Sequence, residues 1–307
     1  MNFTIIETKK IDNLVVMQIY LNQKKSFDHI SGRTATQKKH LEIKEITESG
    51  SVNEIIVINK SKYFVFLMDS DILVGAKQNR VVNTSILLAP FSKTELPVSC
   101  IERDRWHHTS EKFHFSDNII PDKIRVKKAL AVNKNLEEEN LFMANQHEVW
   151  SEVTMESKKH SIYSDTNDLD EILRIKKKNI DSQLKNIKPN KNANGVIVFI
   201  NKKITSADFF GSKLIYAEYF KKIVMNGFAD REQINKSEFK NLNSEKLVSK
   251  ANKLFAKIKE IEYKKYKGVG VGTELRGETK KYSITQLKHK SSLIHLSILR
   301  KTSSGNS

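Results

Sequence analysis

The chain has 307 residues and is 38% hydrophobic, which is enough to bury a substantial core in two lobes. No apolar run approaches the roughly 20 residues that span a bilayer, and residues 1–7 lack the pattern of a secretory signal peptide. Because Cys100 is the only cysteine, an internal disulfide is excluded. These features lead us to expect a cytoplasmic protein without a membrane partner.

The net charge of +17 raises the question of nucleic-acid binding. Only nine of the 53 basic residues are arginine, and the lysines are spread along the chain without an aromatic-interleaved patch. We interpret the charge mainly as solvated, lysine-rich faces. Binding of nucleic acid or another polyanion stays as the alternative.

The first part of the chain has the pattern of a strand-rich lobe. Many short strands with short polar connections indicate antiparallel sheets in a sandwich-like arrangement. Residues 103–121 are rich in His, Ser and Asp and are predicted to be irregular. We therefore predict an N-terminal lobe over residues 1–121. Its strands are predicted from apolar and β-branched runs at 2–8, 12–21, 40–47, 54–60, 63–69, 79–88 and 93–102.

The pattern then becomes helical and afterwards mixed. Residues 122–188 hold three amphipathic helical patterns, one of them near 137–160, and residues 189–194 indicate a linker. Residues 195–301 are predicted to form a mixed αβ part that packs on the first lobe, followed by a tail at 302–307. The fold class that follows is α+β. The mixed part is predicted to contain strands at 196–201 and 203–208, helices at 212–227 and 244–258, and strands at 260–267, 269–276, 281–288 and 293–299.

The segment 74–85 is unusually polar for its place between strands. Alternate residues of a strand face opposite sides, and here both sides carry side chains that donate hydrogen bonds. Buried polar groups must be paired, because unpaired ones cost free energy. The segment therefore predicts a saturated structural network or a ligand-binding site. Its candidate ligand-binding residues are Lys77, Gln78, Asn79, Arg80 and Asn83.

Arg80 is the best single candidate for binding an anionic ligand, because a planar guanidinium can hold a phosphate or carboxylate with two hydrogen bonds. The alternative is a structural ion pair with Asp69, Asp71 or Glu102. These three carboxylates are in turn the candidate catalytic residues, as general acid or base or as ligands of a divalent metal. For the two aspartates, the alternative is an ordinary turn at a strand end.

Further candidates lie in the polar run that follows and in the helical segment. Arg105 and Trp106 are candidate ligand-binding residues, since an indole can stack on a base; the alternative for Trp106 is a core position. Cys100 has no adjacent base in the sequence, and we expect a buried, inert thiol. Gln146 and Trp150 complete the set, and Gln146 either ties its helix to the sheet or points into a pocket. The histidines nearby lack the helical spacing of many zinc sites, so no metal ligand is assigned.

Several sequence segments run in order through most of the chain and form a recognisable set: Glu54–Lys60, Gly75–Arg80 with Asn83 and Ser85, Pro97–Glu102, Arg105–Trp106, Gln146–Trp150, Ala207–Phe210 and Ile294–Leu296. Together they resemble one known family, the ARG and rhodanese-phosphatase-superfamily-associated protein domain. The family's acidic pair before the glycine motif corresponds here to Asp69 and Asp71. The resemblance supports the choice of the candidate residues above and assigns no catalytic role.

The resemblance implies a role around NAD-derived or ADP-ribose-containing molecules. We expect the protein to act on a phosphorylated nucleotide of this kind, as a hydrolase or transferase. A non-catalytic nucleotide sensor is the second hypothesis, and a nucleic-acid-binding factor that uses the basic surface is the third. The pocket is expected where the strands at 69–106 meet the helix at 137–160, because ligand sites favour junctions between lobes.

Overall fold

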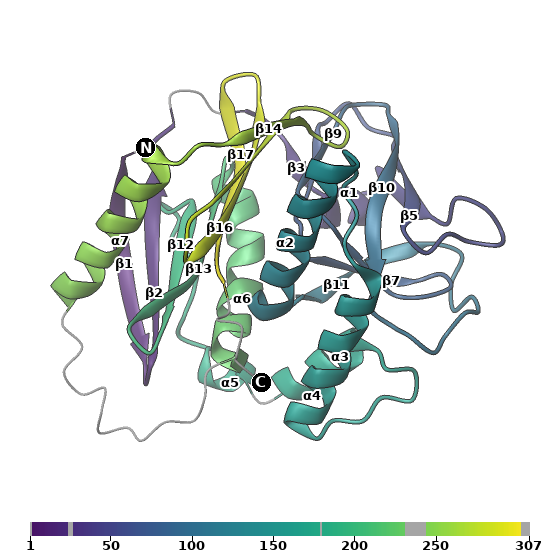
Figure 1. Cartoon of the computed structure of the whole chain (residues 1–307), viewed down its shortest axis with the longest axis horizontal. Coiled ribbons are helices and arrows are strands. Elements are labelled where there is room, and N and C mark those ends of the chain that lie inside the picture. Colours follow the sequence, from purple (N-terminus) through teal and green to yellow (C-terminus); the bar gives the residue numbers. More distant parts are fainter. Residues whose placement is uncertain (1, 24–26, 179, 231–243, 302–307) are drawn as a thin grey trace.

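The computed structural model of the chain describes residues 2–23, 27–178, 180–230 and 244–301. The fold is α+β, and two groups of mostly antiparallel strands lie side by side with helices packed on them (Figure 1). One group is a single eight-stranded sheet. The other is a pair of smaller sheets that share a hydrophobic core.

The eight-stranded sheet is antiparallel and joins the two ends of the chain. Hydrogen bonds between β2 and β12 place residues 3–21, which the sequence assigned to the N-terminal lobe, in the sheet formed by the C-terminal part. Nearly every residue of β2 is buried, as expected of an inner strand covered on both faces. In spatial order the strands are β1 (Phe3–Ile11), β2 (Leu14–Leu21), β12 (Gly195–Ile200), β13 (Lys203–Phe210), β17 (Ser292–Arg300), β16 (Tyr282–His289), β15 (Thr273–Glu278) and β14 (Lys264–Lys267).

Two helices cover opposite faces of this sheet. Helix α6 (Lys213–Asp230) packs on the face that carries Val16, and α7 (Ser244–Glu260) packs on the face that carries Val15. Because side chains alternate along a strand, consecutive residues of β2 enter two separate hydrophobic clusters. Leu247, Ala251 and Leu254 form the buried stripe of α7 and leave the lysines of this helix exposed.

The second group of strands is the sandwich-like lobe expected from the sequence. Leu67 and Leu88 of the smaller sheet and Val57 and Val98 of the larger one meet in a single hydrophobic cluster. The smaller sheet consists of β3 (Ile30–Ser31), β6 (Val65–Leu67) and β9 (Ile86–Leu88), with β3 parallel to β6. The larger sheet consists, in spatial order, of β11 (Phe113–Ile119), β7 (Asp71–Gly75), β8 (Arg80–Val82), β10 (Lys93–Cys100), β5 (Glu54–Asn59) and β4 (Leu41–Lys44).

Of the helices of the middle segment, α2 contacts both groups of strands, whereas α3 and α4 pack on the larger sheet. Val149 and Ile172, from α3 and α4, pack with Ile72 and Val81 on the outer face of the larger sheet. Val126 of α2 packs with Leu299 of β17, so α2 contacts both groups. The helices of the first 194 residues are α1 (Gly32–Gln37), α2 (Asp122–Glu138), α3 (Gln146–His160), α4 (Leu169–Lys177) and α5 (Ile180–Gln183).

Some predicted strands and loops are wrong where polar residues redirect the backbone. The strand predicted at 79–88 is two strands in different sheets, because the chain passes from β8 to β9 through the polar residues 83–85. Residues 103–121 are only partly irregular, since β11 forms there and pairs with β7. The polar stretch after β2 contains α1, whose N-cap Ser31 accepts a hydrogen bond from the backbone of Thr34.

Two helix predictions also differ from the structure. The pattern near 137–160 covers the end of α2, a connection and then α3, for which Asn145 is the N-cap. The helix predicted to end at Gly227 continues to residue 230. A Cβ atom at Gly227 would lie 2.7 Å from the side chain of Val198. This glycine therefore permits close packing of α6 on β12 and does not end the helix.

Candidate functional site

The predicted site around the 74–85 segment is a buried polar network. Arg105 forms an ion pair with Glu102 at 2.6 Å and donates to the backbone oxygen of Ala76, also at 2.6 Å. Glu102 accepts a further hydrogen bond from the backbone of Asn79, whose side chain donates to Asp168. Burial acts to raise the pKa of Glu102, but the hydrogen bonds from Arg105 and the backbone hold it below its ordinary value. Glu102 is therefore an ionised, fully engaged member of a network.

Arg80 is also held by protein groups. Its guanidinium donates to Gln78 at 2.9 Å, to the backbone oxygen of Ser51 at 3.0 Å and to the thiol of Cys100. Its exposed fraction is 0%, so this guanidinium has no open side on which to hold a phosphate. Its ion-pair partner is Glu45, at 3.8 Å, and not one of the three carboxylates (Asp69, Asp71 and Glu102) that the sequence suggested. Burial raises the pKa of Cys100 to about 11, which agrees with an inert thiol.

Two predicted amide side chains join elements of the fold. Gln146 makes two hydrogen bonds of 2.8 Å with the backbone of Cys100, and these tie α3 to β10. Asn83 donates to the backbone of Phe142 at 3.1 Å and accepts from Ser99 at 2.8 Å. Gln146 therefore ties its helix to the sheet, which is the first of the two alternatives stated for it.

The two candidate tryptophans lie beside cations. Trp106 is 45% exposed, and the ammonium of Lys77 and the guanidinium of Arg80 each lie 5.6 Å from the centre of its ring. Trp150 has the guanidinium of Arg103 at 5.7 Å from its ring centre. A cation over an indole face is a favourable contact in itself. These rings are thus already engaged with protein groups.

The two predicted catalytic aspartates take different partners. Asp69 forms two hydrogen bonds with Arg125, at 2.8 and 3.0 Å, and Arg125 also binds Asp208 at 2.6 and 2.9 Å. Asp71 accepts a hydrogen bond of 2.6 Å from Tyr219. Burial acts to raise the pKa of Asp69, but the charge of Arg125 outweighs it and holds the pKa well below the ordinary value. Burial raises the pKa of Asp71.

The sequence reasoning missed Arg125, which joins α2 to both groups of strands. It is fully buried and lies at the centre of the junction between them. One sequence signal could have indicated it: arginine is scarce in this chain, and four of the nine arginines are buried in such networks. Burial and ion pairing favour arginine over lysine, because the guanidinium keeps its charge and offers five donors.

A buried trio next to Arg125 has the residue types of a nucleophilic triad, but the two nitrogens of its imidazole are exchanged relative to such a triad. The Oγ of Ser85 lies 2.9 Å from Nδ1 of His295, and Nε2 of His295 lies 3.3 Å from Asp208. None of the three side chains is more than 2% exposed. A serine nucleophile must reach its substrate. We therefore assign the trio to the structural network between the sheets.

None of the twelve predicted site residues lines any of five prominent hollows formed by the described part of the chain. The junction where we expected the pocket is bridged by Gln146. Among the described residues, no group of three or more His, Cys, Asp or Glu side chains is placed to hold a metal ion. Ligand binding by the twelve residues stays a prediction.

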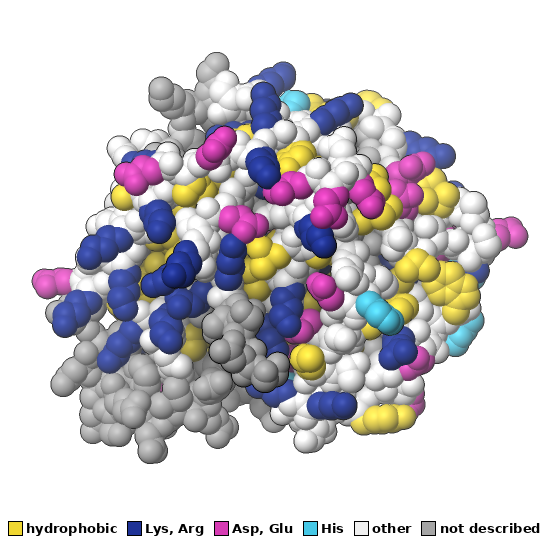
Figure 2. Space-filling view, viewed as in Figure 1, with side chains coloured by type: hydrophobic (Ala, Val, Ile, Leu, Met, Phe, Trp, Pro, Cys, Tyr) yellow, Lys and Arg dark blue, Asp and Glu magenta, His cyan; other side chains and the backbone are white. Residues whose placement is uncertain are grey.

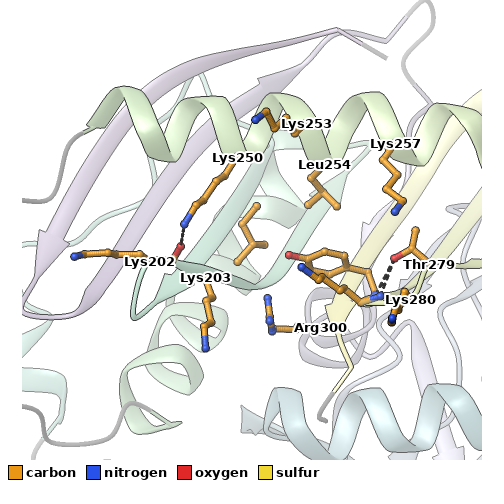
Figure 3. A pocket seen from close by; sticks show the side chains of 12 residues that line it. Lys202, Lys203, Lys250, Lys253, Leu254, Lys257, Thr279, Lys280 and Arg300 are labelled. Atoms are coloured by element: carbon orange, nitrogen blue, oxygen red, sulfur yellow. Dashed lines mark hydrogen bonds between the residues drawn. The ribbon is translucent and has the colours of Figure 1, made fainter.

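A strongly basic groove lies on the other side of the molecule, between α7 and the ends of the central strands (Figure 3). It encloses about 480 Å³, and none of its described lining residues is acidic. Tyr282 supplies an aromatic ring, and Leu254 and Ile204 supply apolar surface. We call it the basic groove. Its charged lining residues are Lys202, Lys203, Lys250, Lys253, Lys257, Lys280, Lys281 and Arg300.

The groove is built on regular backbone. Tyr282 and Arg300 are paired residues on β16 and β17, and the turn before Tyr282 is held by Thr279, whose Oγ1 accepts from two backbone N–H groups. On the opposite wall, Lys250 of α7 donates to the backbone oxygen of Lys202 at 2.7 Å. Groups on paired strands and on a packed helix are held in fixed positions.

The basic groove gathers exposed lysines that are dispersed along the sequence. Its charges come from four segments, at 202–203, 250–257, 280–281 and 300, which the fold brings together. Figure 2 shows lysine and arginine side chains crowded over this part of the surface. A concentration of like charge in a concave surface creates a strong positive potential and attracts anions.

A second hollow adjoins the groove and has mixed charge. It encloses about 680 Å³ and shares Lys203, Lys280, Lys281 and Arg300 with the groove. We call it the mixed hollow. Its remaining lining residues include the carboxyl groups of Asp122, Glu156 and Asp230.

The carboxyl groups of the mixed hollow differ in the direction of their pKa shifts. Burial raises the pKa of Asp122 to about 7 and also raises the pKa of Asp230. For Glu156, burial is outweighed by Lys176, which holds the pKa below its ordinary value. A carboxyl group with a pKa near 7 can both donate and accept a hydrogen bond at neutral pH.

The model of one family matches residues 2–299: the ARG and Rhodanese-Phosphatase-superfamily-associated Protein domain. The chain belongs to this family. Comparison with curated proteins and with solved structures found no match. Within the described residues, no helix is long and apolar enough to cross a membrane.

The segments that carry the family resemblance meet in the buried networks. Gly75–Arg80 and Glu102 contribute to the network of Arg105, while Ser85, Asp208 and His295 contribute to the network of Arg125. In this member of the family, the Arg125 network joins the two groups of strands. The Arg105 network lies within the sandwich-like lobe and ties its larger sheet to Asp168, the N-cap of α4. The basic groove lies outside these segments.

Proposed function

We propose that this family member binds a phosphorylated nucleotide related to NAD or ADP-ribose, with the phosphates in the basic groove. The observation that carries the proposal is the convergence of eight basic side chains around Tyr282 without an acidic lining residue in the described chain. Phosphate groups would relieve the mutual repulsion of these charges. The ring of Tyr282 and the side chain of Leu254 offer an apolar surface for a base.

The volume of the groove supports a small ligand. At about 480 Å³ it lies within the range of about 300–1,000 Å³ that is typical of ligand sites. The buried network of Arg80 and Arg105 would then serve as the frame of the neighbouring lobe. Hydrolase or transferase turnover is the first form of the proposal, and a sensor that returns the nucleotide unchanged is the second.

Calorimetric titration with ADP-ribose and ADP tests this proposal. In the variant Lys280→Ala/Lys281→Ala, we expect at least about tenfold weaker binding, equivalent to about 1.4 kcal/mol. The matched control is Lys38→Ala/Lys93→Ala, which removes two exposed lysines outside the groove and leaves the same net charge. Equal weakening in both variants, or no binding by the wild type, would contradict the proposal. Chromatography of the nucleotide after incubation with excess protein separates turnover from sensing.

Nucleic-acid binding is a second candidate, and one observation favours it. Lys250, Lys253 and Lys257 follow each other at helical spacing along the exposed face of α7, and a row of charges of this kind can also follow the phosphates of a single strand. Affinity for a single-stranded oligonucleotide should then fall steeply with salt, through counterion release. Salt-independent or absent binding would remove this candidate.

A further inference from the structure

The basic groove and the mixed hollow meet along a common wall. Lys203, Lys280, Lys281 and Arg300 line both spaces, so a ligand that contacts these four residues can extend to either side. The wall has a fixed backbone, because the backbone N–H of Lys301 donates to the backbone oxygen of Lys281 at 2.9 Å. This bond continues the pairing of β16 and β17. The two spaces are therefore adjoining halves of one continuous surface.

The two halves differ in the chemistry that they favour. The charged side chains of the groove are all basic among its described residues and lie beside the apolar surface of Leu254 and Ile204, which suits phosphates and a base. The mixed hollow also has basic side chains, but it adds three carboxyl groups and the neutral polar side chains of Asn201 and Thr205. A sugar hydroxyl is neutral and donates to a carboxylate, whereas a phosphate is better placed against the basic side chains of the common wall.

The carboxyl groups are accessible from the hollow. The side chain of Asp122 is 15% exposed and that of Asp230 is 23% exposed. Lys176 pairs with Glu156 at 2.5 Å and with Asp230 at 3.3 Å, but the side chain of Glu156 is only 8% exposed. Asp122 and Asp230 are the more exposed carboxyl groups and are therefore the groups best placed to meet a sugar.

We propose that the two hollows form one site for a nucleoside diphosphate whose second phosphate carries a sugar. The diphosphate lies across Lys203, Lys280, Lys281 and Arg300, the nucleoside lies in the basic groove, and the sugar hydroxyls donate to Asp122 and Asp230. This inference rests on the proposed function, and it adds that the sugar beyond the diphosphate is recognised. ADP-ribose has this composition, and ADP lacks the second sugar.

Titration calorimetry of the full chain with ADP and ADP-ribose separates the two halves. We expect the wild type to bind ADP-ribose at least about tenfold more tightly than ADP. In Asp122→Asn and in Asp230→Asn, the preference should fall to about threefold or less, with ADP binding unchanged or tighter because a nearby negative charge is lost. Asp165→Asn is the matched control, since Asp165 is exposed and lines neither hollow.

The outcomes distinguish this inference from the proposed function. Suppose that the wild type binds ADP and ADP-ribose equally well and that Lys280→Ala/Lys281→Ala weakens the binding of ADP. This result would overturn the inference and leave the proposed function standing. A preference that persists in both aspartate variants would also overturn it. No binding of either nucleotide would overturn both. Melting temperatures of the variants establish that each is folded, and the two aspartate variants test the same hollow independently.

Discussion

Replacing Arg125 with methionine tests whether its ion pairs hold the two groups of strands together. Methionine fills a similar length without charge, so Asp69 and Asp208 would both stay buried without their partner. Breaking a buried pair on one side costs about 3–5 kcal/mol, because an uncompensated buried charge is left behind. An unfolding entropy of about 2.1 cal/mol/K per residue over the 307 residues converts this loss to a Tm decrease of about 5–8 °C at neutral pH.

The loss should depend on pH in a defined direction. In the wild type, burial acts to raise the pKa values of both aspartates, but Arg125 holds them below the ordinary value. Their contribution to stability is thus present above the pKa of the unfolded chain and is lost as pH falls through the folded values. Without Arg125, burial dominates and the folded pKa values rise, so the charged carboxylates become costly above them. The difference between variant and wild type should therefore be largest near pH 7.5 and smaller at pH 5.

Differential scanning fluorimetry or calorimetry at pH 5 and pH 7.5 measures both effects. The matched control is Arg174→Met, because the Arg174 side chain is 75% exposed and lies 4.0 Å from Glu171. An exposed pair of this kind contributes about 0–1 kcal/mol, and the control should melt within about 2 °C of the wild type. A variant at Arg125 that melts as the wild type does, or whose deficit is the same at both pH values, would refute the reasoning.

Three further variants or reactions test other parts of the structure. The free energy of unfolding of Asp122→Asn, measured relative to the wild type, should be up to about 4 kcal/mol higher at pH 8 than at pH 4. The reason is that a folded pKa of about 7 makes the ionised carboxyl group of the wild type costly above that pH; a difference that does not change with pH would contradict this. Arg80→Ala should lower the Tm by several degrees and leave ADP affinity unchanged below the melting transition; loss of ADP binding in folded protein would return the nucleotide site to the 74–85 segment. Cys100 should react with a thiol reagent at pH 8 far more slowly in native protein than in guanidinium, because burial raises its pKa to about 11; equal rates would contradict its burial.

The sequence predicted local structure well where one physical signal dominated. The apolar alternation at 281–288 and 293–299 gave β16 and β17 within two residues, because a strand covered by helices shows its pattern directly. The helix predicted at 244–258 is α7, in which Leu247, Ala251 and Leu254 are buried at helical spacing. Residues 83–85 were assigned to a strand because nothing local shows that their polar groups bond to distant elements, such as Thr84 to Glu274.

The site depended on contacts that the sequence does not display. The scarcity of arginine drew attention to Arg80, but only the fold shows that its guanidinium is fully buried and donates to Gln78 and Ser51. The segment at 74–85 was correctly recognised as a concentration of buried polar groups. Whether such a group bonds to protein or to a ligand depends on its neighbours in space, and these come from residues far apart in the chain.

The sequence by itself determined the α+β class, the family, most of the helices and strands, and the buried state of Cys100. Only the tertiary structure decided that β2 pairs with β12 and that the lysines at 202–203, 250–257 and 280–281 line one groove. Propensity and periodicity act over a few residues, and they fix local conformation. The groove arises from the pairing of strands and the docking of α7, which bring together charges that no local pattern connects.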